Sequence, residues 1–354
     1  MENLVQFPAL GLEFTIDRVA FAIGEFNVYW YGILLALGLL GGLGFAFRYA
    51  VDFGVDSDRL VDVVVVGTVM AIVCARIYYV AMAPFSYNSI WEMIDLRNGG
   101  IAVYGSLIGA FVFGGLACKW RKIPMLPTFD MVAMGFLIGQ AIGRWGNFVN
   151  QEAFGTNTAL PWGMYSQATN AYLAANQATL AAEGVTVDPA LPVHPTFLYE
   201  SLWCVLGFVL LFLFMKKRCF NGEIFLLYAI WYGAGRFWIE GLRTDALMLS
   251  VELNLRASQV VAAVTVVLGI ALELWFRRKY KGITLMVPLA VADLKAYGTA
   301  YPDGPMVRAL AAGSSHAEFV RATAEWNKEI KQLSSVPGGK EPGAADKETT
   351  AAEE

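Results

Sequence analysis

Seven long apolar segments alternate with shorter polar ones along most of this 354-residue chain. Each segment approaches or reaches the roughly 20 residues with which a helix crosses a bilayer, and no water-soluble core needs so many. The pattern predicts an all-α polytopic membrane protein with seven transmembrane helices and a small extracytoplasmic cap. The expected spans are about 28–47, 60–83, 101–118, 128–145, 195–215, 223–241 and 257–276.

Three segments interrupt or flank this membrane domain, which we place at residues 28–281. Residues 1–27 form an extracytoplasmic arm, and the polar, Ala/Asn/Gln-rich insertion at 156–193 forms the cap. Within the cap, "NAYLAANQATLAAEG" predicts a short helix that the prolines of "DPALPVHP" end. We expect residues 282–354 to be a cytoplasmic tail, with one amphipathic helix in "SSHAEFVRATAEWNKEIKQL" and a disordered, charge-rich end.

The basic residues separate the loops into two groups. The long 146–194 loop has no lysine or arginine, and the other loops on its side hold only Arg97, Arg243 and Arg256. Because cytoplasmic loops are enriched in lysine and arginine, we expect the amino terminus outside and the carboxyl terminus in the cytosol. The basic residues of the opposite, cytoplasmic side are Arg48, Arg59, Lys119, Arg121, Lys122, Lys216, Lys217, Arg218, Arg277, Arg278, Lys279 and Lys281.

The composition limits the metals, cofactors and partners that we expect for this chain. The chain is 57% hydrophobic and 16% charged, against about 45–50% and about 25% in soluble domains. Its four cysteines lack metal-ligand spacing and read as packing residues, and there are only two histidines. No basic stripe suggests nucleic acid. We therefore expect no metal, no cofactor and no nucleic-acid partner.

Five ionisable residues stand inside or at the ends of the apolar segments, apart from the basic loops: Arg76, Arg144, Glu200, Arg236 and Glu240. An ionisable side chain within a membrane span is costly and indicates function by default. With the expected orientation, all five lie in the outer halves of their spans. They therefore converge on one depth, and Glu200 needs a partner, for which Arg76 is a candidate.

Arg236 and Glu240, in "GRFWIEGLR", lie four residues apart and share a helix face, with Arg243 nearly in line one turn further on. The pair can be a self-satisfied ion pair, or Glu240 can orient Arg236 toward an anionic ligand. The scarcity of charges in membrane spans favours the second interpretation.

Arg144 is the second residue of "GRWGNFVNQEAFG" and lies between Gly143 and Gly146. Because glycines permit unusual dihedral angles, we expect the helix to break here and expose its polar groups to a cavity. Asn147 and Glu152 then supply neutral and negative partners, and Arg144 and Arg236 together can hold a phosphate through forked hydrogen bonds.

Three further residues are ambiguous from the sequence. Tyr104 in "GGIAVYGSLIG" and Tyr31 in "VYWYG" can hydrogen-bond a ligand or serve as interfacial anchors. The glycines beside Tyr104 fit tight helix packing, as between Gly105 and Gly109. His194, in "HPTFLYE", can bind substrate or have no role.

These stretches resemble the bacterial phosphatidylglycerol–prolipoprotein diacylglyceryl transferases. "GRWGNFVNQEAFG" is similar to that family's signature, and "VYWYG", "GGIAVYGSLIG", "HPTFLYES" and "GRFWIEGLRTD" resemble its other blocks in the same order, across about residues 25–280. The resemblance implies a seven-span inner-membrane enzyme of lipoprotein maturation. It would move the diacylglyceryl group of phosphatidylglycerol to the lipobox cysteine of a preprolipoprotein signal peptide and release glycerol 1-phosphate.

The same resemblance implies the site. Arg144 takes the place of the essential phosphatidylglycerol-binding arginine, and Arg236 with Glu240 forms a second functional pair. Tyr31 matches a functional tyrosine. Asn147, Glu152 and Gly155 match neighbours in the signature, while Arg243, His194 and Tyr104 are added from the residue patterns above. The expected substrate-binding set is Arg144, Asn147, Glu152, Gly155, Arg243 and His194, and the expected catalytic set is Arg144, Arg236, Glu240, Tyr104 and Tyr31.

One departure concerns the proton acceptor. Several members of the family carry a histidine, proposed as a base, where this chain has Tyr104. A tyrosine hydroxyl has a pKa of about 10, so it is a poor base at neutral pH. The thiol proton can go to Tyr104, Glu152 or the substrate phosphate, and the sequence leaves these open. A transporter of an anionic solute is the rival class; it predicts internal repeats and charges at the bilayer midplane, and neither is found here.

Overall fold

The computed structural model describes residues 3–24, 26–83, 85, 87, 89–95, 99–244, 248–250 and 255–280. The described part is mostly helical. The described part of the chain divides into two compact units, one made of its residues up to 46 and from 131 onward, and the other of its residues between 47 and 130. The predicted tail helix and the disordered end lie outside the described residues.

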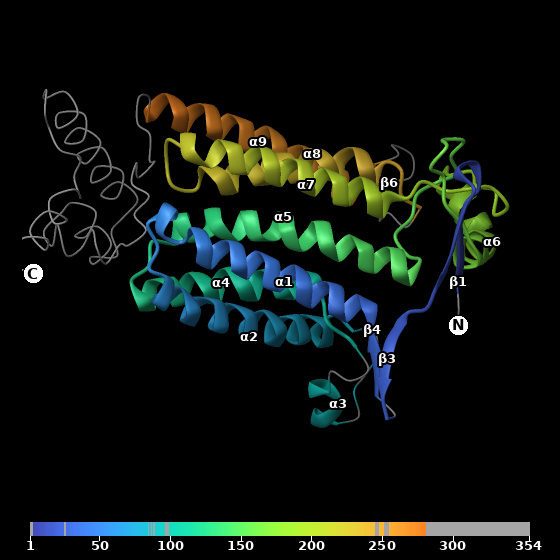
Figure 1. The fold of residues 1–354 in the computed structure, drawn as a ribbon, viewed down its shortest axis with the longest axis horizontal. Helices are drawn as coiled ribbons and strands as arrows, with labels where there is room; N and C mark the ends of the chain where they lie inside the picture. Colours follow the sequence, from blue (N-terminus) through green and yellow to red (C-terminus); the bar gives the residue numbers. More distant parts are fainter. Residues whose placement is uncertain are drawn as a thin grey trace, which may run out of the picture. The chain divides into compact units, whose positions relative to one another are not determined.

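Helices cover all seven predicted apolar segments (Figure 1). Among the described residues, six helices are long and apolar enough to cross a membrane. The seventh, α8, has 18 residues and carries Glu223, Arg236 and Glu240, so it falls outside this set. The helices are α1 (Trp30–Tyr49), α2 (Ser57–Ala81), α4 (Val103–Arg121), α5 (Met125–Asn150), α7 (Thr196–Phe214), α8 (Glu223–Glu240) and α9 (Ala257–Lys279).

The first unit holds most of the candidate residues, and its helices approach one another closely. α1 and α5 meet backbone to backbone, since a Cβ on Gly38 would lie 3.1 Å from Gly139 Cα and one on Gly42 would lie 3.1 Å from the Gly135 carbonyl oxygen. Such contacts are typical of membrane helices packed through small residues. α7, α8 and α9 run side by side (Figure 1).

Two tryptophans fix the register of α7 against α8. The indole N–H of Trp203 donates to the Trp231 carbonyl and that of Trp231 donates to the Trp203 carbonyl, each at 2.9 Å. Their rings stack with centroids 4.2 Å apart. Each indole lies over a glycine of the facing helix, Gly235 and Gly207 respectively, where a Cβ would clash. This reciprocal tryptophan contact sets the position of Arg236, the residue after Gly235.

Residues 3–29 form short strands, which the sequence analysis did not predict. β1 (Asn3–Phe7) pairs with β2 (Leu12–Ile16) and with β5 (Tyr165–Ser166), in the order β2-β1-β5, and β3 (Val19–Ile23) pairs with β4 (Phe26–Tyr29). A further antiparallel pair joins β6 (Met248–Ser250) and β7 (Leu255–Arg256).

The predicted short helix of the insertion is confirmed as α6 (Gln167–Ala182), which begins with a capping box between Ser166 and Thr169. The insertion has its own apolar core, and β1 contributes to it. The residues of this core are Val5, Phe154, Met164, Leu173, Leu180, Val187, Val193 and Phe197. The arm and the insertion therefore fold together.

The second unit contains α2, α4 and the short α3 (Ile90–Ile94). The predicted packing role of Gly105 and Gly109 is confirmed, because a Cβ on either would collide with α2, at the Cys74 and Met70 carbonyls respectively.

Candidate functional site

Glu200 is the centre of the charged groups in the first unit. It lies in the second turn of α7 and is 5% exposed. Its Oε2 lies 2.6 Å from a terminal nitrogen of Arg144 on α5. Its Oε1 lies 3.7 Å from Arg236 on α8 and 3.5 Å from Arg243 just beyond α8. One carboxylate thus draws together guanidinium groups from three separate parts of the chain.

The predicted pair of Arg236 and Glu240 is confirmed. The two charged groups lie 2.7 Å apart, one helical turn from each other. Beyond them, Arg256 donates to the backbone carbonyls of Glu240 and Arg243, the second at 3.0 Å, and so fixes the end of α8. Glu240 therefore holds Arg236 in place from within the helix, an arrangement that both interpretations of the pair require.

We call Arg144, Glu200, Arg236, Glu240 and Arg243 the arginine–glutamate cluster. The two carboxylate side chains are almost buried, whereas those of Arg144 and Arg236 keep 21% and 25% of their surface exposed. Three arginines against two glutamates leave one positive charge. A guanidinium has five donors, and a carboxylate uses at most a pair of them at a time.

Arg76 is not the partner of Glu200, so that sequence expectation is wrong. The guanidinium of Arg76 instead donates to four backbone carbonyls of its own unit, those of Glu92, Met93, Gly99 and Gly100, at 2.7–3.0 Å. Carbonyl dipoles satisfy this charge, and Glu200 takes its partners from the three arginines above.

The expected helix break at Arg144 is also wrong. α5 continues without interruption through Asn150. The chain leaves the helix only at the next residues, where Gln151 and Ala153 have φ of 57°. A glycine in a helix costs roughly 1 kcal/mol relative to alanine, which favourable packing can offset, and Gly146 is packed against the Tyr31 ring.

The signature segment folds back on the end of α5. The side-chain amides of Asn147 and Asn150 donate to Glu152 Oε1 at 2.9 and 3.2 Å. Arg144 donates to Asn147 Oδ1 at 3.5 Å. A polar chain thus leads from the arginine–glutamate cluster to Glu152.

Gly155 serves close packing. Its N–H donates to the His194 carbonyl at 2.9 Å, and it forms an isolated bridge with Arg243. A Cβ here would lie 2.8 Å from His194 Cβ and 2.9 Å from the Leu242 carbonyl oxygen. The absence of a side chain therefore lets this segment sit against the backbone that carries Arg243.

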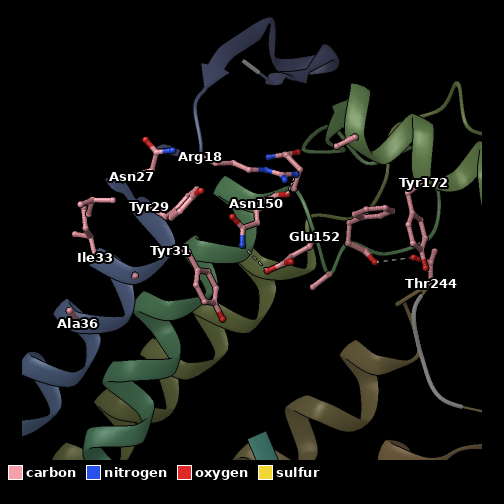
Figure 2. Close-up of a pocket in the computed structure, with 16 residues that line it drawn as sticks. Arg18, Asn27, Tyr29, Tyr31, Ile33, Ala36, Asn150, Glu152, Tyr172 and Thr244 are labelled. Carbon is pink, nitrogen blue, oxygen red and sulfur yellow. Dashed lines mark hydrogen bonds between the residues drawn. The ribbon is translucent and has the colours of Figure 1, made fainter. Parts of the chain in front are cut away.

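A pocket of about 1020 Å³ opens beside this segment (Figure 2). In this view Asn150 and Glu152 lie between Tyr31, at the start of α1, and Tyr172 of α6. We call it the tyrosine-lined pocket; it is lined by Arg18, Asn27, Val28, Tyr29, Tyr31, Gly32, Ile33, Ala36, Asn150, Gln151, Glu152, Ala153, Phe154, Ala168, Tyr172 and Thr244. Of the predicted site residues, Tyr31 and Glu152 lie in it.

Gly146 tests how Tyr31 is positioned. A Cβ at Gly146 would lie 2.5 Å from Tyr31 Cδ2, so Gly146→Ala should displace the ring and cost about 1–3 kcal/mol of stability. Gly143→Ala is the matched control, since its Cβ would meet Leu35 Cδ2 at an ordinary 3.6 Å. Thermal unfolding in detergent should show a lower midpoint for Gly146→Ala alone; equal midpoints would contradict the packing role.

The remaining predicted site residues are Tyr104 and His194. Tyr104 is in the first turn of α4, in the second unit, with 71% of its surface exposed. His194 precedes α7, and its Nδ1 is 3.1 Å from the Tyr199 hydroxyl. Their roles in binding or catalysis stay predictions.

His194 is expected to make the stability of the folded protein depend on pH. Partial burial lowers the pKa of this imidazole below its ordinary value of about 6.5. Between the two pKa values the unfolded chain binds more protons than the folded protein, so stability rises with pH there and falls as the pH drops below about 6.5. His194→Gln should weaken this acid loss in thermal unfolding measured from pH 7 down to about 5. Identical pH profiles for variant and wild type would contradict it.

Sequence reasoning undervalued Glu200 and missed part of the pocket. Glu200 stood out as a charge within an apolar segment, but the choice among its possible partners required the fold. Arg18, which donates to the Asn150 carbonyl at 2.8 Å, and Gln151 were not singled out. Their only signal was their place in or near the signature and the arm.

The apolar helices and the buried arginine–glutamate cluster define a multi-pass membrane protein with a charged site among its helices. A sequence model of the prolipoprotein diacylglyceryl transferase family matches residues 18–275, which include the whole cluster and the pocket. The chain belongs to the prolipoprotein diacylglyceryl transferase family, as its sequence motifs predicted.

Individual relatives agree. The chain is 41% identical over 276 residues to the phosphatidylglycerol–prolipoprotein diacylglyceryl transferase of Geobacillus kaustophilus (strain HTA426), over 75% of this chain and 94% of the relative. The enzyme of the same name from Clostridioides difficile (strain 630) is 38% identical, over 75% and 98%. That from Staphylococcus aureus (strain bovine RF122 / ET3-1) is 40% identical, over 77% and 93%.

Proposed function

We propose that this protein transfers the diacylglyceryl group of phosphatidylglycerol to the lipobox cysteine of a preprolipoprotein and releases glycerol 1-phosphate. The observation that carries the proposal is the convergence of Arg144, Arg236 and Arg243 on Glu200, which together with Glu240 leaves one positive charge in excess. Family membership supplies the reaction class.

In the reaction, the cysteine Sγ attacks the carbon of the diacylglyceryl group that is bonded to the phosphate oxygen. A carbon–sulfur bond forms, the carbon–oxygen bond to the phosphate breaks, and its electron pair leaves with glycerol 1-phosphate. Only a few per cent of a cysteine thiol with pKa about 8.5 is ionised at neutral pH. Arginines beside the reacting groups favour the incoming thiolate and neutralise the charge of the leaving phosphate.

We assign Arg144 and Arg236 to the phosphate as a clamp. Both keep exposed surface while their inner donors are held, Arg144 by Glu200 and Arg236 by Glu240. A guanidinium fixed on one side presents its remaining N–H groups in a set direction, which suits forked binding of a phosphate. Arg243 adds positive charge on the same carboxylate.

We assign the thiol proton to Glu152. This carboxylate lines the tyrosine-lined pocket and is oriented by the amides of Asn147 and Asn150. Tyr104 and the substrate phosphate are the alternative acceptors. A rate that is unchanged in Tyr104→Phe and lost in Glu152→Gln supports Glu152, and the reverse result overturns it.

The membrane arrangement completes the proposal. We take α8 as a seventh span, because the charges of Arg236 and Glu240 are satisfied by each other and by Glu200. The bias of basic residues toward one set of loops then places the amino terminus outside and the carboxyl terminus in the cytosol. In this orientation the 156–193 insertion is an extracytoplasmic cap beside the pocket.

The direct test uses purified protein in phosphatidylglycerol vesicles with a lipobox peptide. We expect the peptide to gain the mass of one diacylglyceryl group and free glycerol 1-phosphate to appear in equal amount. A peptide with serine in place of the cysteine is the matched control and should gain nothing. An unmodified cysteine peptide, with active protein of a characterised relative as reference, would overturn the proposal.

A further inference from the structure

The wall that β4 gives to the tyrosine-lined pocket is a strand edge. Three consecutive residues of β4 line the pocket: Asn27, Val28 and Tyr29. Successive side chains of a strand point to opposite faces, so a pocket lying over one face would be lined by alternate residues. Three in a row indicate that the pocket runs along the strand, where backbone N–H and C=O groups lie.

That edge has no strand beside it in the described part of the chain. β4 is hydrogen-bonded to β3 alone, in a two-stranded sheet, and the residues of β3 do not line the pocket. A strand with a single neighbour leaves the backbone groups of its other edge available. An extended peptide can add to such an edge and form main-chain hydrogen bonds.

Gln151, which also lines the pocket, has a side-chain acceptor without a donor among the described residues. The side chain is 4% exposed, and its Oε1 has no hydrogen-bond partner among the described residues. Its Nε2 donates to the Phe148 carbonyl, which fixes which amide atom is the oxygen. A buried polar atom without a partner is costly, so this oxygen is suited to an N–H or O–H brought by a ligand.

The charges of the pocket match a neutral ligand. Among the described lining residues, Arg18 and Glu152 are the one positive and the one negative side chain, and their charges balance. Tyrosines, amides and aliphatic side chains make most of the rest of this described lining. The excess positive charge that a phosphate needs lies in the arginine–glutamate cluster, whose residues do not line this pocket. At about 1020 Å³ the pocket is also at the upper end of ligand sites, about 300–1,000 Å³.

We propose that the tyrosine-lined pocket binds the extended polypeptide next to the reacting cysteine, as a strand added to β4, and that Gln151 Oε1 accepts one of its backbone N–H groups. The inference rests on the proposed function, which requires a peptide substrate, and assigns that substrate a place and a specific polar contact. Gln151 is here a positioning residue for the peptide. The phosphate of the lipid stays with Arg144 and Arg236.

A scan of ester-containing peptides tests this contact. In each peptide one backbone N–H around the cysteine is replaced by oxygen, which removes a single donor. For the wild-type protein we expect two kinds of sensitive position: the N–H groups that donate to β4 carbonyls, and the single N–H group that donates to Gln151 Oε1. Each ester there should raise the peptide KM about threefold to tenfold, as the loss of a hydrogen bond worth about 0.5–1.5 kcal/mol requires. The KM for phosphatidylglycerol should not change.

The matched variants are Gln151→Met, which keeps the length of the side chain without the acceptor, and Gln167→Met, an exposed residue of α6 outside the pocket. Gln151→Met should raise the KM of the normal peptide by the same factor. It should lose all sensitivity to the ester at the peptide position that donates to Gln151 Oε1. Gln167→Met should keep the wild-type pattern.

Each other outcome is decisive. No sensitive position in the wild-type scan overturns the inference without any variant. Persistence of every penalty in Gln151→Met overturns the role of Gln151, and loss of every penalty overturns the added strand. A rise in the KM for phosphatidylglycerol in Gln151→Met would assign the pocket to the lipid headgroup instead. Absence of any transfer by the wild-type protein is a separate result, which overturns the proposed function itself.

Discussion

Arg144→Ala is expected to lower kcat of diacylglyceryl transfer by about 10²–10³-fold and to raise the KM for phosphatidylglycerol. Removing one preorganised donor from a developing negative charge typically costs this much. Arg144 is the guanidinium closest to Glu200, at 2.6 Å, and it also contacts Asn147 of the signature segment. Its loss removes both the grip on the phosphate and the link to Glu152. The measurement is steady-state transfer to a lipobox peptide in phosphatidylglycerol vesicles.

Two further variants control this result. Arg144→Lys keeps the charge but loses the forked geometry, so it should fall between wild type and Arg144→Ala. Arg59→Ala removes an exposed arginine that lies 3.6 Å from Asp56, a surface pair of little value, and should keep full activity. Full transfer by purified, reconstituted Arg144→Ala would contradict the clamp.

The helices were predictable because their signal is local. A run of apolar residues long enough to cross a bilayer predicts a helix without knowledge of its neighbours, and the structure has a helix at each of the seven runs. α6 was also predictable, although it ends at Ala182, just before Gly184 with its φ of 80°, and not at the prolines further along the chain. The ends of α5 were not, because Gly146 weakens a helix only where nothing packs on it.

The strands of residues 3–29 were not predictable in the same way. β1 is five residues long and pairs with β5, which is about 160 residues away in the sequence. Its buried residue, Val5, packs into the apolar core of the insertion. Neither the short arm nor the insertion carries a strand signal that stands alone, and so the arm appeared as a separate segment.

The charged residues of the site were visible, but their pairing was not. A glutamate or arginine in an apolar segment is unusual by itself, so the sequence indicated Arg144, Glu200 and Arg236 as functional. The partner of Glu200 depends on how α5, α7 and α8 are rotated about their axes. The stacked Trp203 and Trp231 help to set that rotation for α7 and α8, through contacts that no spacing rule encodes.

Glu200→Gln is expected to lower kcat by about 10–10²-fold without raising the KM for phosphatidylglycerol. The carboxylate makes ion pairs with three arginines, and hydrogen bonds to charged groups are worth about 1.5–3 kcal/mol each. The neutral amide keeps the shape of the side chain but leaves the cluster with three arginines against Glu240 alone. The added positive charge still attracts the lipid phosphate, while the guanidinium groups lose the anchor that aims them at the transition state.

This split separates Glu200 from the residues that touch the phosphate. Arg144→Ala should change both constants, whereas Glu200→Gln should change kcat alone, because it removes alignment and not charge attraction. Glu240→Gln is the matched control: Arg236 loses its partner at 2.7 Å but keeps Glu200 at 3.7 Å, so its effect should be smaller. A loss in Glu200→Gln no greater than that in Glu240→Gln, or a parallel rise in KM, would contradict a central role for Glu200. A selective fall in kcat would show that one buried carboxylate sets the geometry of three arginines.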